Sequence, residues 1–308
     1  MKRVAKNIAL HLPYLKQVIL ERDALRAEKK RHTMWAHPPG HYYSPIPSID
    51  EIRLREHEIF DDIPKEIPGI NLNEAGQLAL LDELRGFYAE LPFECHKKAG
   101  MRYFFENPSF GHGDGIVFYC MIRRLRPKRI IEVGCGYSSS AILDTNEMFF
   151  DNSISCTFIE PYPELLRSLL KEGDAERAGI IQKKIQDVDT ATFASLRSGD
   201  ILFIDSTHVT KMDSDVNHIF FRILPHLESG VYIHFHDIFY PFDYPKEWIY
   251  RGIAWNEAYL LKAFLQFNDA FEIQFFNSFL SLFRKDEFMG AFPLAAKNTG
   301  GSIWLRKA

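Results

Sequence analysis

Short apolar runs that alternate with helix-like segments dominate the chain after residue 114. Five such runs, rich in Ile, Val and Phe, occupy residues 129–133, 156–159, 179–182, 201–204 and 231–235. Runs of this length are typical of strands buried on both faces of a parallel sheet. Segments 139–149, 163–170 and 214–224 can hold crossover helices, and 271–277 and 300–306 predict two closing strands. The pattern predicts a doubly wound α/β fold.

The first hundred residues carry a different pattern. Residues 13–31 place apolar side chains at helical spacing, which predicts an amphipathic helix that lies on the body of the protein or on a partner chain. Four prolines exclude a helix over 37–47, and Ser48 followed by Glu51 resembles a capping box at the start of a short helix. A further helix is expected within 71–91. We therefore expect two parts, a helical and loop extension over 1–100 and a larger domain over 101–308.

Composition excludes several classes of protein. An apolar fraction of 46% in 308 residues is enough for a large core, and a formal charge of -4 argues against a nucleic-acid partner. The four cysteines form no C-x-x-C pair, which indicates reduced thiols and a cytoplasmic protein. The N-terminal stretch has no apolar run as long as that of an export signal. No run of 18 apolar residues occurs, so the sequence predicts no membrane span.

A glycine turn follows the first predicted strand, in Glu132-Val-Gly-Cys-Gly136. Glycines at this place let a ligand approach the amides of the next helix closely. A dinucleotide fingerprint needs a third glycine where Ser139 stands, and its pyrophosphate would meet the Glu132 carboxylate. S-adenosylmethionine carries a sulfonium and an ammonium, which an acidic side chain attracts. The turn therefore favours binding of S-adenosylmethionine over binding of a dinucleotide. The alternative is a glycine turn that binds no ligand.

Two further segments fit an adenosyl ligand. Glu160 ends the second strand, 24 residues beyond Gly136, where a carboxylate can accept both ribose hydroxyls. Gln186 and Asp187 follow the third strand and suit an adenine edge. A solvated glutamate at a strand end is the alternative for Glu160.

Four polar residues follow the fourth and fifth strands: Asp205, His208, His236 and Asp237. The carboxyl ends of neighbouring parallel strands meet at one crevice, so these side chains should converge. One interpretation is a Mg²⁺ ion or another divalent cation on Asp205 and Asp237, and another is a general base at His208. An iron site of His208, His236 and Asp205 is a third, and hydrogen bonding at strand ends without catalysis is a fourth.

Several motifs together carry a family resemblance. They are Glu132-Val-Gly-Cys-Gly136, Phe158-Ile-Glu160, Gln186-Asp187-Val188, Asp200-Ile-Leu-Phe-Ile-Asp-Ser-Thr-His208, Ser214-Asp-Val-Asn217 and Val231-Tyr-Ile-His-Phe-His-Asp-Ile-Phe-Tyr-Pro241. Residues 100–308 resemble a class I S-adenosylmethionine-dependent methyltransferase, and more narrowly the bacterial branch related to macrocin-type sugar O-methyltransferases. The resemblance implies a seven-stranded sheet with one antiparallel strand.

The resemblance also assigns roles to residues. The cofactor-binding residues expected from it are Glu132, Gly134, Gly136, Tyr137, Ser138, Glu160, Gln186 and Asp187, with Ser138 standing where the family usually has a third glycine. Asp205 and His208 are the expected catalytic residues, and Asp205, His236 and Asp237 the expected metal ligands. The N-terminal extension is expected to cover the acceptor site or to mediate association into a homo-oligomer.

The function that follows is methyl transfer from S-adenosylmethionine to a hydroxyl of a small molecule, such as a sugar or another natural product. The aromatic segment 238–248 could stack on that acceptor or simply pack as core. Two alternatives stay open. One is an Fe(II) and 2-oxoglutarate-dependent hydroxylase on the same fold, and the other is a protein that binds an adenosyl ligand without catalysis.

Overall fold

The computed structural model describes residues 13–32 and 36–308 of the chain. The expectation that no export signal is present concerns the stretch up to Asp23, of which residues 1–12 lie outside the described part. Two compact units divide the chain, Met1–Asp62 and Ile63–Ala308. None of the helices in the described ranges combines the length and apolarity that crossing a bilayer requires.

The described residues of the first unit include helices α2 (Pro13–His32), α3 (Ile49–Leu54) and α4 (Glu56–Phe60). The Ser48 hydroxyl accepts a hydrogen bond from the Glu51 backbone N–H at 3.3 Å, so the expected cap at the start of α3 is confirmed. Leu15, Val18 and Leu25 along α2 are exposed.

The second unit is built on one seven-stranded sheet. Its strands are β1 (Arg129–Val133), β2 (Ser155–Ile159), β3 (Gly179–Ile181), β4 (Ile201–Ile204), β5 (Tyr232–His236), β6 (Phe271–Phe276) and β7 (Ser302–Lys307). Their order is β3-β2-β1-β4-β5-β7-β6, and only β7 runs antiparallel to its neighbours β5 and β6. The predicted doubly wound sheet with one antiparallel strand is confirmed.

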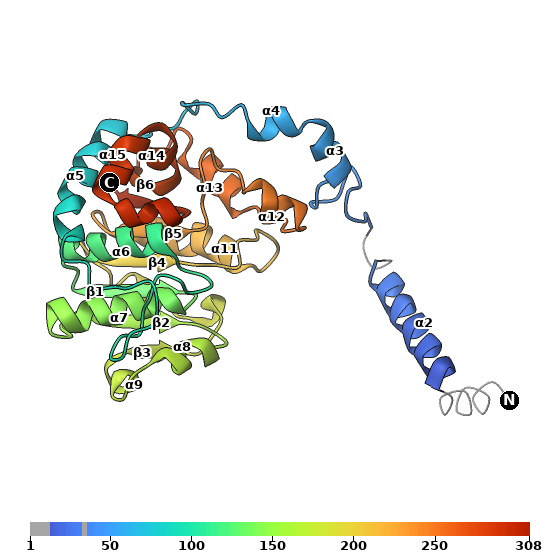
Figure 1. Ribbon diagram of the computed structural model, residues 1–308, viewed down its shortest axis with the longest axis horizontal. Helices are drawn as coiled ribbons and strands as arrows, with labels where there is room; N and C mark the ends of the chain where they lie inside the picture. The colour runs from blue at the N-terminus through green and yellow to red at the C-terminus, as the bar shows by residue number, and fades with distance from the viewer. Residues whose placement is uncertain (1–12, 33–35) are drawn as a thin grey trace. The chain divides into compact units, whose positions relative to one another are not determined.

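Helices connect and cover these strands (Figure 1). They are α5 (Glu74–Tyr88), α6 (His112–Leu125), α7 (Tyr137–Phe150), α8 (Glu164–Leu169), α9 (Asp174–Arg177), α10 (Thr190–Phe193), α11 (Asp215–His218), α12 (Lys246–Tyr250), α13 (Glu257–Leu265), α14 (Asn277–Phe283) and α15 (Lys285–Ala291). Short 3-10 helices lie at Ile185–Asp187, Leu224–His226 and Pro293–Lys297. Helix α6 packs against both α5 and α7.

The crossover helix expected over 214–224 is divided. Helix α11 continues into a π-helical turn at Ile219–Ile223 and then into the 3-10 turn at Leu224–His226. Pro225 lies within that last turn, and a proline has no N–H to donate to an α-helical ladder. The segment still buries Phe220, whose ring lies 5.6 Å from that of Phe235 on β5.

Helix α5 is fixed to the sheet by Gln77. This side chain is fully buried, accepts a hydrogen bond from the Phe276 backbone N–H at 2.8 Å and donates to the Leu72 carbonyl at 2.6 Å. Because Phe276 ends β6, the contact ties α5 directly to the sheet. Residues 63–100 thus belong to the same compact unit as the sheet, whereas the sequence placed the boundary near residue 100.

A buried arginine joins the segment before α6 to α7 and α9. The Arg102 guanidinium donates to both oxygens of Asp174 at 2.7 Å and also to Asp144 at 2.6 Å and Glu147 at 2.7 Å. Asp144 in turn accepts the backbone N–H groups of Arg102 and Tyr103 at 2.8 Å. An unpaired charge inside a protein is costly. The Arg102 guanidinium therefore stabilises the buried carboxylates of Asp144 and Asp174.

We predict that Arg102→Met lowers the free energy of unfolding by about 3–5 kcal/mol, because it removes the buried cation that Asp144 and Asp174 share. Urea denaturation followed by circular dichroism measures this loss. Arg177→Met is the matched control, since Arg177 pairs with the same Asp174 at 2.8 Å but is half exposed and should cost no more than about 1 kcal/mol. Equal losses in the two variants would contradict the prediction.

Candidate functional site

The loop after β1 lies directly against the residue that follows β4. Gly134 adopts φ +79°, and a Cβ there would lie 1.9 Å from the Asp205 carbonyl oxygen. The Gly134 N–H donates to the Ile159 carbonyl at 3.1 Å, and the Asp205 N–H donates to the Val133 carbonyl at 2.8 Å. Glycine is required here for two reasons, the left-handed backbone and the close approach.

Glu132 supports this loop from within the core. Its carboxyl is fully buried and accepts a hydrogen bond from the Ser139 hydroxyl, which itself accepts the Gly136 N–H at 3.0 Å. Burial raises the pKa of Glu132 to about 8, although the serines at the start of α7 oppose the shift. The other carboxyl oxygen has no hydrogen-bond partner within the described structure.

A cavity of about 370 Å³ opens beside the glycine turn, and we call it the first cavity. Gly134, Glu160, Gln186 and Asp205 are among its lining residues. Glu160 accepts the backbone N–H groups of Cys135 at 3.3 Å and Tyr162 at 2.8 Å, so its carboxylate is held in place at the cavity. The cavity therefore brings together residues from the ends of β1, β2 and β4.

Other expected cofactor residues lie outside this lining. The side chain of Glu132 is one of them, and Asp187 is exposed at the end of a 3-10 turn, whereas its neighbour Gln186 lines the cavity and donates to the Asp213 carbonyl at 2.7 Å. Ser138 is buried in the first turn of α7, and the Tyr137 ring packs edge-on against Phe104. Their assignment to a cofactor stays a prediction.

The four polar residues after β4 and β5 converge as the sequence predicts. Oδ1 of Asp205 lies 3.2 Å from Nε2 of His208 and 3.5 Å from Nδ1 of His236. Oδ2 of Asp237 lies 3.7 Å from each of the same two nitrogens. Two carboxylates and two imidazoles thus surround one point, and we call these four side chains the central cluster.

The central cluster is electrostatically coupled. Burial disfavours a charged imidazole, but hydrogen bonds to Asp205 and Glu257 outweigh it and raise the pKa of His208 to about 10. The carboxylates of Asp237 and Asp205 likewise overcome burial and raise the pKa of His236. Burial opposes the ionised form of Asp205, yet the two histidines lower its pKa. The two imidazoles are therefore held as cations.

Glu257, at the start of α13, is part of this arrangement. The side chain is fully buried, and its Oε2 lies 2.9 Å from Nδ1 of His208 and accepts the Ser206 hydroxyl at 2.9 Å. The sequence left Glu257 open between a helix-capping residue and a ligand. Its position 49 residues beyond His208 gave no local spacing from which the contact could be inferred.

His208 and Asp237 have an unusual backbone. Their φ angles are +58° and +56°, in the left-handed region that few non-glycine residues adopt. Residues in such conformations often lie at functional sites.

A second cavity, of about 440 Å³, is lined in part by the central cluster. His236 and Asp237 line it, together with Phe105, Phe239 and Trp248. Asp205 lines the first cavity, so the central cluster contributes to both. Within the aromatic segment 238–248, Phe239 and Trp248 face the cavity, whereas Tyr240, Phe242 and Tyr244 are buried as core. The core interpretation is confirmed for these three residues, and stacking of Phe239 or Trp248 on an acceptor stays a prediction.

Comparison with known proteins agrees with the fold. A family model described as a methyltransferase domain matches residues 131–238. An uncharacterized protein of Archaeoglobus fulgidus is 38% identical over 170 residues, which cover 53% of this chain and 75% of that protein.

Solved structures with a similar fold are more distant. The methyltransferase PaMTH1 of Podospora anserina, bound to SAH, is 18% identical with a TM-score of 0.42, over 63% of this chain and 77% of that one. The O-methyltransferase TomG of Streptomyces achromogenes, in complex with SAM, is 15% identical with a TM-score of 0.38, over 72% and 87%. A structure of cmcI-D160 with Mg and SAM is 18% identical with a TM-score of 0.41, over 83% and 95%.

The family model and the strand order, and not these distant likenesses, identify the family. The matched residues run from β1 to the residue after Asp237 and include the glycine turn, Glu160 and the whole central cluster. A seven-stranded sheet with a single antiparallel strand is also what the family resemblance implied. The matched part of the chain, residues 131–238, is a methyltransferase domain of the class I S-adenosylmethionine-dependent type.

Proposed function

We propose that the protein transfers the methyl group of S-adenosylmethionine to a hydroxyl of a small molecule bound in the second cavity. The observation that carries this proposal is the position of the central cluster, with Asp205 on the first cavity and His236 and Asp237 on the second. Methyl transfer requires the acceptor oxygen, methyl carbon and sulfur to be aligned. A donor in one cavity and an acceptor in the other meet at the cluster.

The first cavity suits the adenosyl donor. Glu160 has lone pairs left after accepting two backbone amides, and they can accept the ribose hydroxyls. Gln186 and Asp187 lie at the adenine end of the proposed ligand, with Gly134 and Gly136 at the methionine end. Glu132 acts mainly through the loop that it supports.

The second cavity suits an acceptor with a flat or ring-shaped body and polar groups. Phe105, Phe239 and Trp248 supply aromatic faces, and Asn107 and Asn298 supply amide groups. Such a lining fits a sugar or a phenolic natural product, because aromatic rings stack on both and amides hydrogen-bond to hydroxyls.

The central cluster fits a divalent cation. Nδ1 of His236 is buried and makes no hydrogen bond within the described structure, although two carboxylate oxygens lie within 3.7 Å of it. Oxygens of Asp205 and Asp237 and a nitrogen of His208 lie within 4.8 Å of one another. A cation held there would lower the pKa of an acceptor hydroxyl. Because imidazole donors suit transition metals, Mn²⁺ or Fe²⁺ fits this set better than Mg²⁺.

His208 is placed to take the proton of the acceptor. Glu257 fixes the ring through Nδ1 and leaves Nε2 directed at the cluster. As long as the carboxylates hold His208 protonated, it cannot act as a base. A bound cation would compete for these carboxylates and favour the neutral ring. A cytoplasmic location and a homo-oligomer stay predictions.

We predict that Glu160→Ala weakens the binding of S-adenosylmethionine at least about tenfold, because it removes two charge-assisted hydrogen bonds to the ribose. Isothermal titration calorimetry measures the dissociation constant. Glu164→Ala is the control, since Glu164 is an exposed carboxylate on the neighbouring helix α8 and does not line the first cavity. An unchanged dissociation constant in Glu160→Ala would exclude the ribose assignment.

We also predict that methyl transfer depends on a cation. Chelator-treated enzyme should lose most of its activity and recover it more fully with Mn²⁺ than with the same concentration of Mg²⁺, because the imidazole of His236 belongs to the donor set. Asp237→Asn should abolish the recovery. The measurement is transfer of labelled methyl groups to a panel of sugar and phenolic acceptors.

Two outcomes would revise the mechanism. If chelated enzyme keeps full activity while His208→Ala loses it, the cation has no role and the general base stands; the reverse result removes His208 from the chemistry. Turnover of 2-oxoglutarate with bound Fe(II), without methyl transfer, would favour a hydroxylase in place of a methyltransferase.

A further inference from the structure

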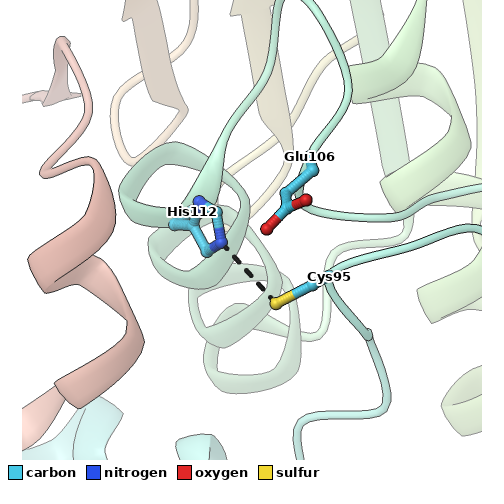
Figure 2. A group of neighbouring side chains, drawn as sticks. All are labelled: Cys95, Glu106 and His112. Carbon is cyan, nitrogen blue, oxygen red and sulfur yellow. Dashed lines mark hydrogen bonds between the residues drawn. The ribbon is translucent and has the colours of Figure 1, made fainter.

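A second group of metal-binding side chains lies outside the central cluster. Cys95 comes from the loop after α5, Glu106 from the loop before α6, and His112 is the first residue of α6 (Figure 2). Sγ of Cys95 lies 4.0 Å from Nε2 of His112. Each residue offers a ligand atom, and these atoms all lie within 4.8 Å of one another. Figure 2 shows the three side chains directed toward a common point.

The backbone holds these residues together without a metal. The Glu106 N–H donates to the Cys95 carbonyl at 2.8 Å, and the Phe105 N–H donates to the Glu94 carbonyl at 2.9 Å. The His112 ring stacks on Phe105 at a centroid distance of 5.0 Å, which fixes its orientation. A site whose ligands are positioned in advance costs less conformational entropy on binding.

A positive charge already lies at this group. Nζ of Lys297 is 3.4 Å from Sγ of Cys95 and 3.2 Å from Oε1 of Glu106. The other oxygen of Glu106 lies 3.2 Å from Nδ1 of His96. The Lys297 side chain is half exposed, so its ammonium group can move into solvent when another cation arrives. Lys297 therefore marks a place that attracts cations.

We propose that Cys95, Glu106 and His112 bind Zn²⁺. A thiolate, an imidazole and a carboxylate are donors that zinc takes in proteins. Tetrahedral ligands at ~2.0–2.3 Å from the metal lie about 3.5 Å apart. The ligand atoms here lie within 4.8 Å of one another, with 4.0 Å between Sγ of Cys95 and Nε2 of His112, so they have to close slightly around the ion. The donor set differs from the central cluster, which has no thiolate.

Three protein ligands leave one tetrahedral position of the zinc open. Glu106 and His112 also line the second cavity, which contains His236 and Asp237 at the central cluster. If the proposed function is correct, a donor atom of the acceptor can occupy the open position. The zinc would then hold the acceptor by an oxygen or nitrogen distinct from the hydroxyl that receives the methyl group.

Binding of Co²⁺ to the full-length protein tests the site, because a cobalt–thiolate bond gives a charge-transfer absorption band that oxygen and nitrogen ligands do not produce. We expect the wild-type protein to develop this band as Co²⁺ is added, and to lose it when Zn²⁺ is added in excess over both proposed metal sites. Cys95→Ser and His112→Ala should lose the band. Circular dichroism verifies that both variants are folded.

Three control variants separate the site from alternatives. Cys135→Ser removes another half-buried thiol and should keep the band. Asp205→Asn alters the central cluster and should also keep it, so failure of the proposed methyl transfer and failure of the zinc site are distinguishable. Lys297→Met removes the competing ammonium group but no ligand, and should bind Co²⁺ several-fold more tightly.

Two results would overturn the proposal. One is the absence of a thiolate band in folded wild-type protein, and the other is a band that persists in Cys95→Ser. In either case the three residues with Lys297 form an ion-pair cluster and no metal site.

Discussion

The contact between the loop after β1 and the residue after β4 determines where every other part of the site lies. Gly134 brings the loop so close to Asp205 that a single added methyl group would overlap the Asp205 carbonyl oxygen at 1.9 Å. One face of this contact borders the first cavity, through Gly134 and Glu160, and Asp205 extends from it toward His208 and His236. The first cavity and the central cluster are therefore built on the same contact.

In the central cluster, protons on the imidazoles and a divalent cation would compete for the same carboxylates. Asp205 and Asp237 face two imidazoles at 3.2–3.7 Å, and Glu257 adds a third carboxylate behind His208. Protons on the two rings satisfy the carboxylates in the same way that a divalent cation would. The affinity of the cluster for a cation is consequently linked to the protonation of both histidines. Glu257 contacts His208 and is the first residue of α13, so the linkage extends to the start of that helix.

The sequence predicted the sheet and the central cluster well because both follow from local signals. Apolar runs such as 201–204 mark buried strands, and the rule that parallel strands end at a common edge brought Asp205 and Asp237 together without a structure. Glu132 is a less clear case, because the fold buries it beneath the turn, where it supports the loop, while its contact with a ligand stays a prediction. No local pattern distinguishes these two uses of a carboxylate.

Contacts between distant segments could not be predicted. The pairing of Glu257 with His208 and of Arg102 with Asp174 depends on how helices pack on the finished sheet. The cluster of Cys95 with His112 likewise depends on two loops that no periodicity describes. The unit boundary was misplaced relative to the compact units for the same reason, since Gln77 binds a strand almost two hundred residues away.

The left-handed backbone at His208 and Asp237 restricts how this site can change during evolution or engineering. Among non-glycine residues, Asn, Asp and His adopt that region most readily, whereas a β-branched side chain there is strained. Substitutions that the backbone tolerates at these two positions are therefore nearly the same as those that keep a donor atom at the cluster. Substitutions at positions 208 and 237 therefore replace one donor side chain by another more readily than they remove the donor from the cluster.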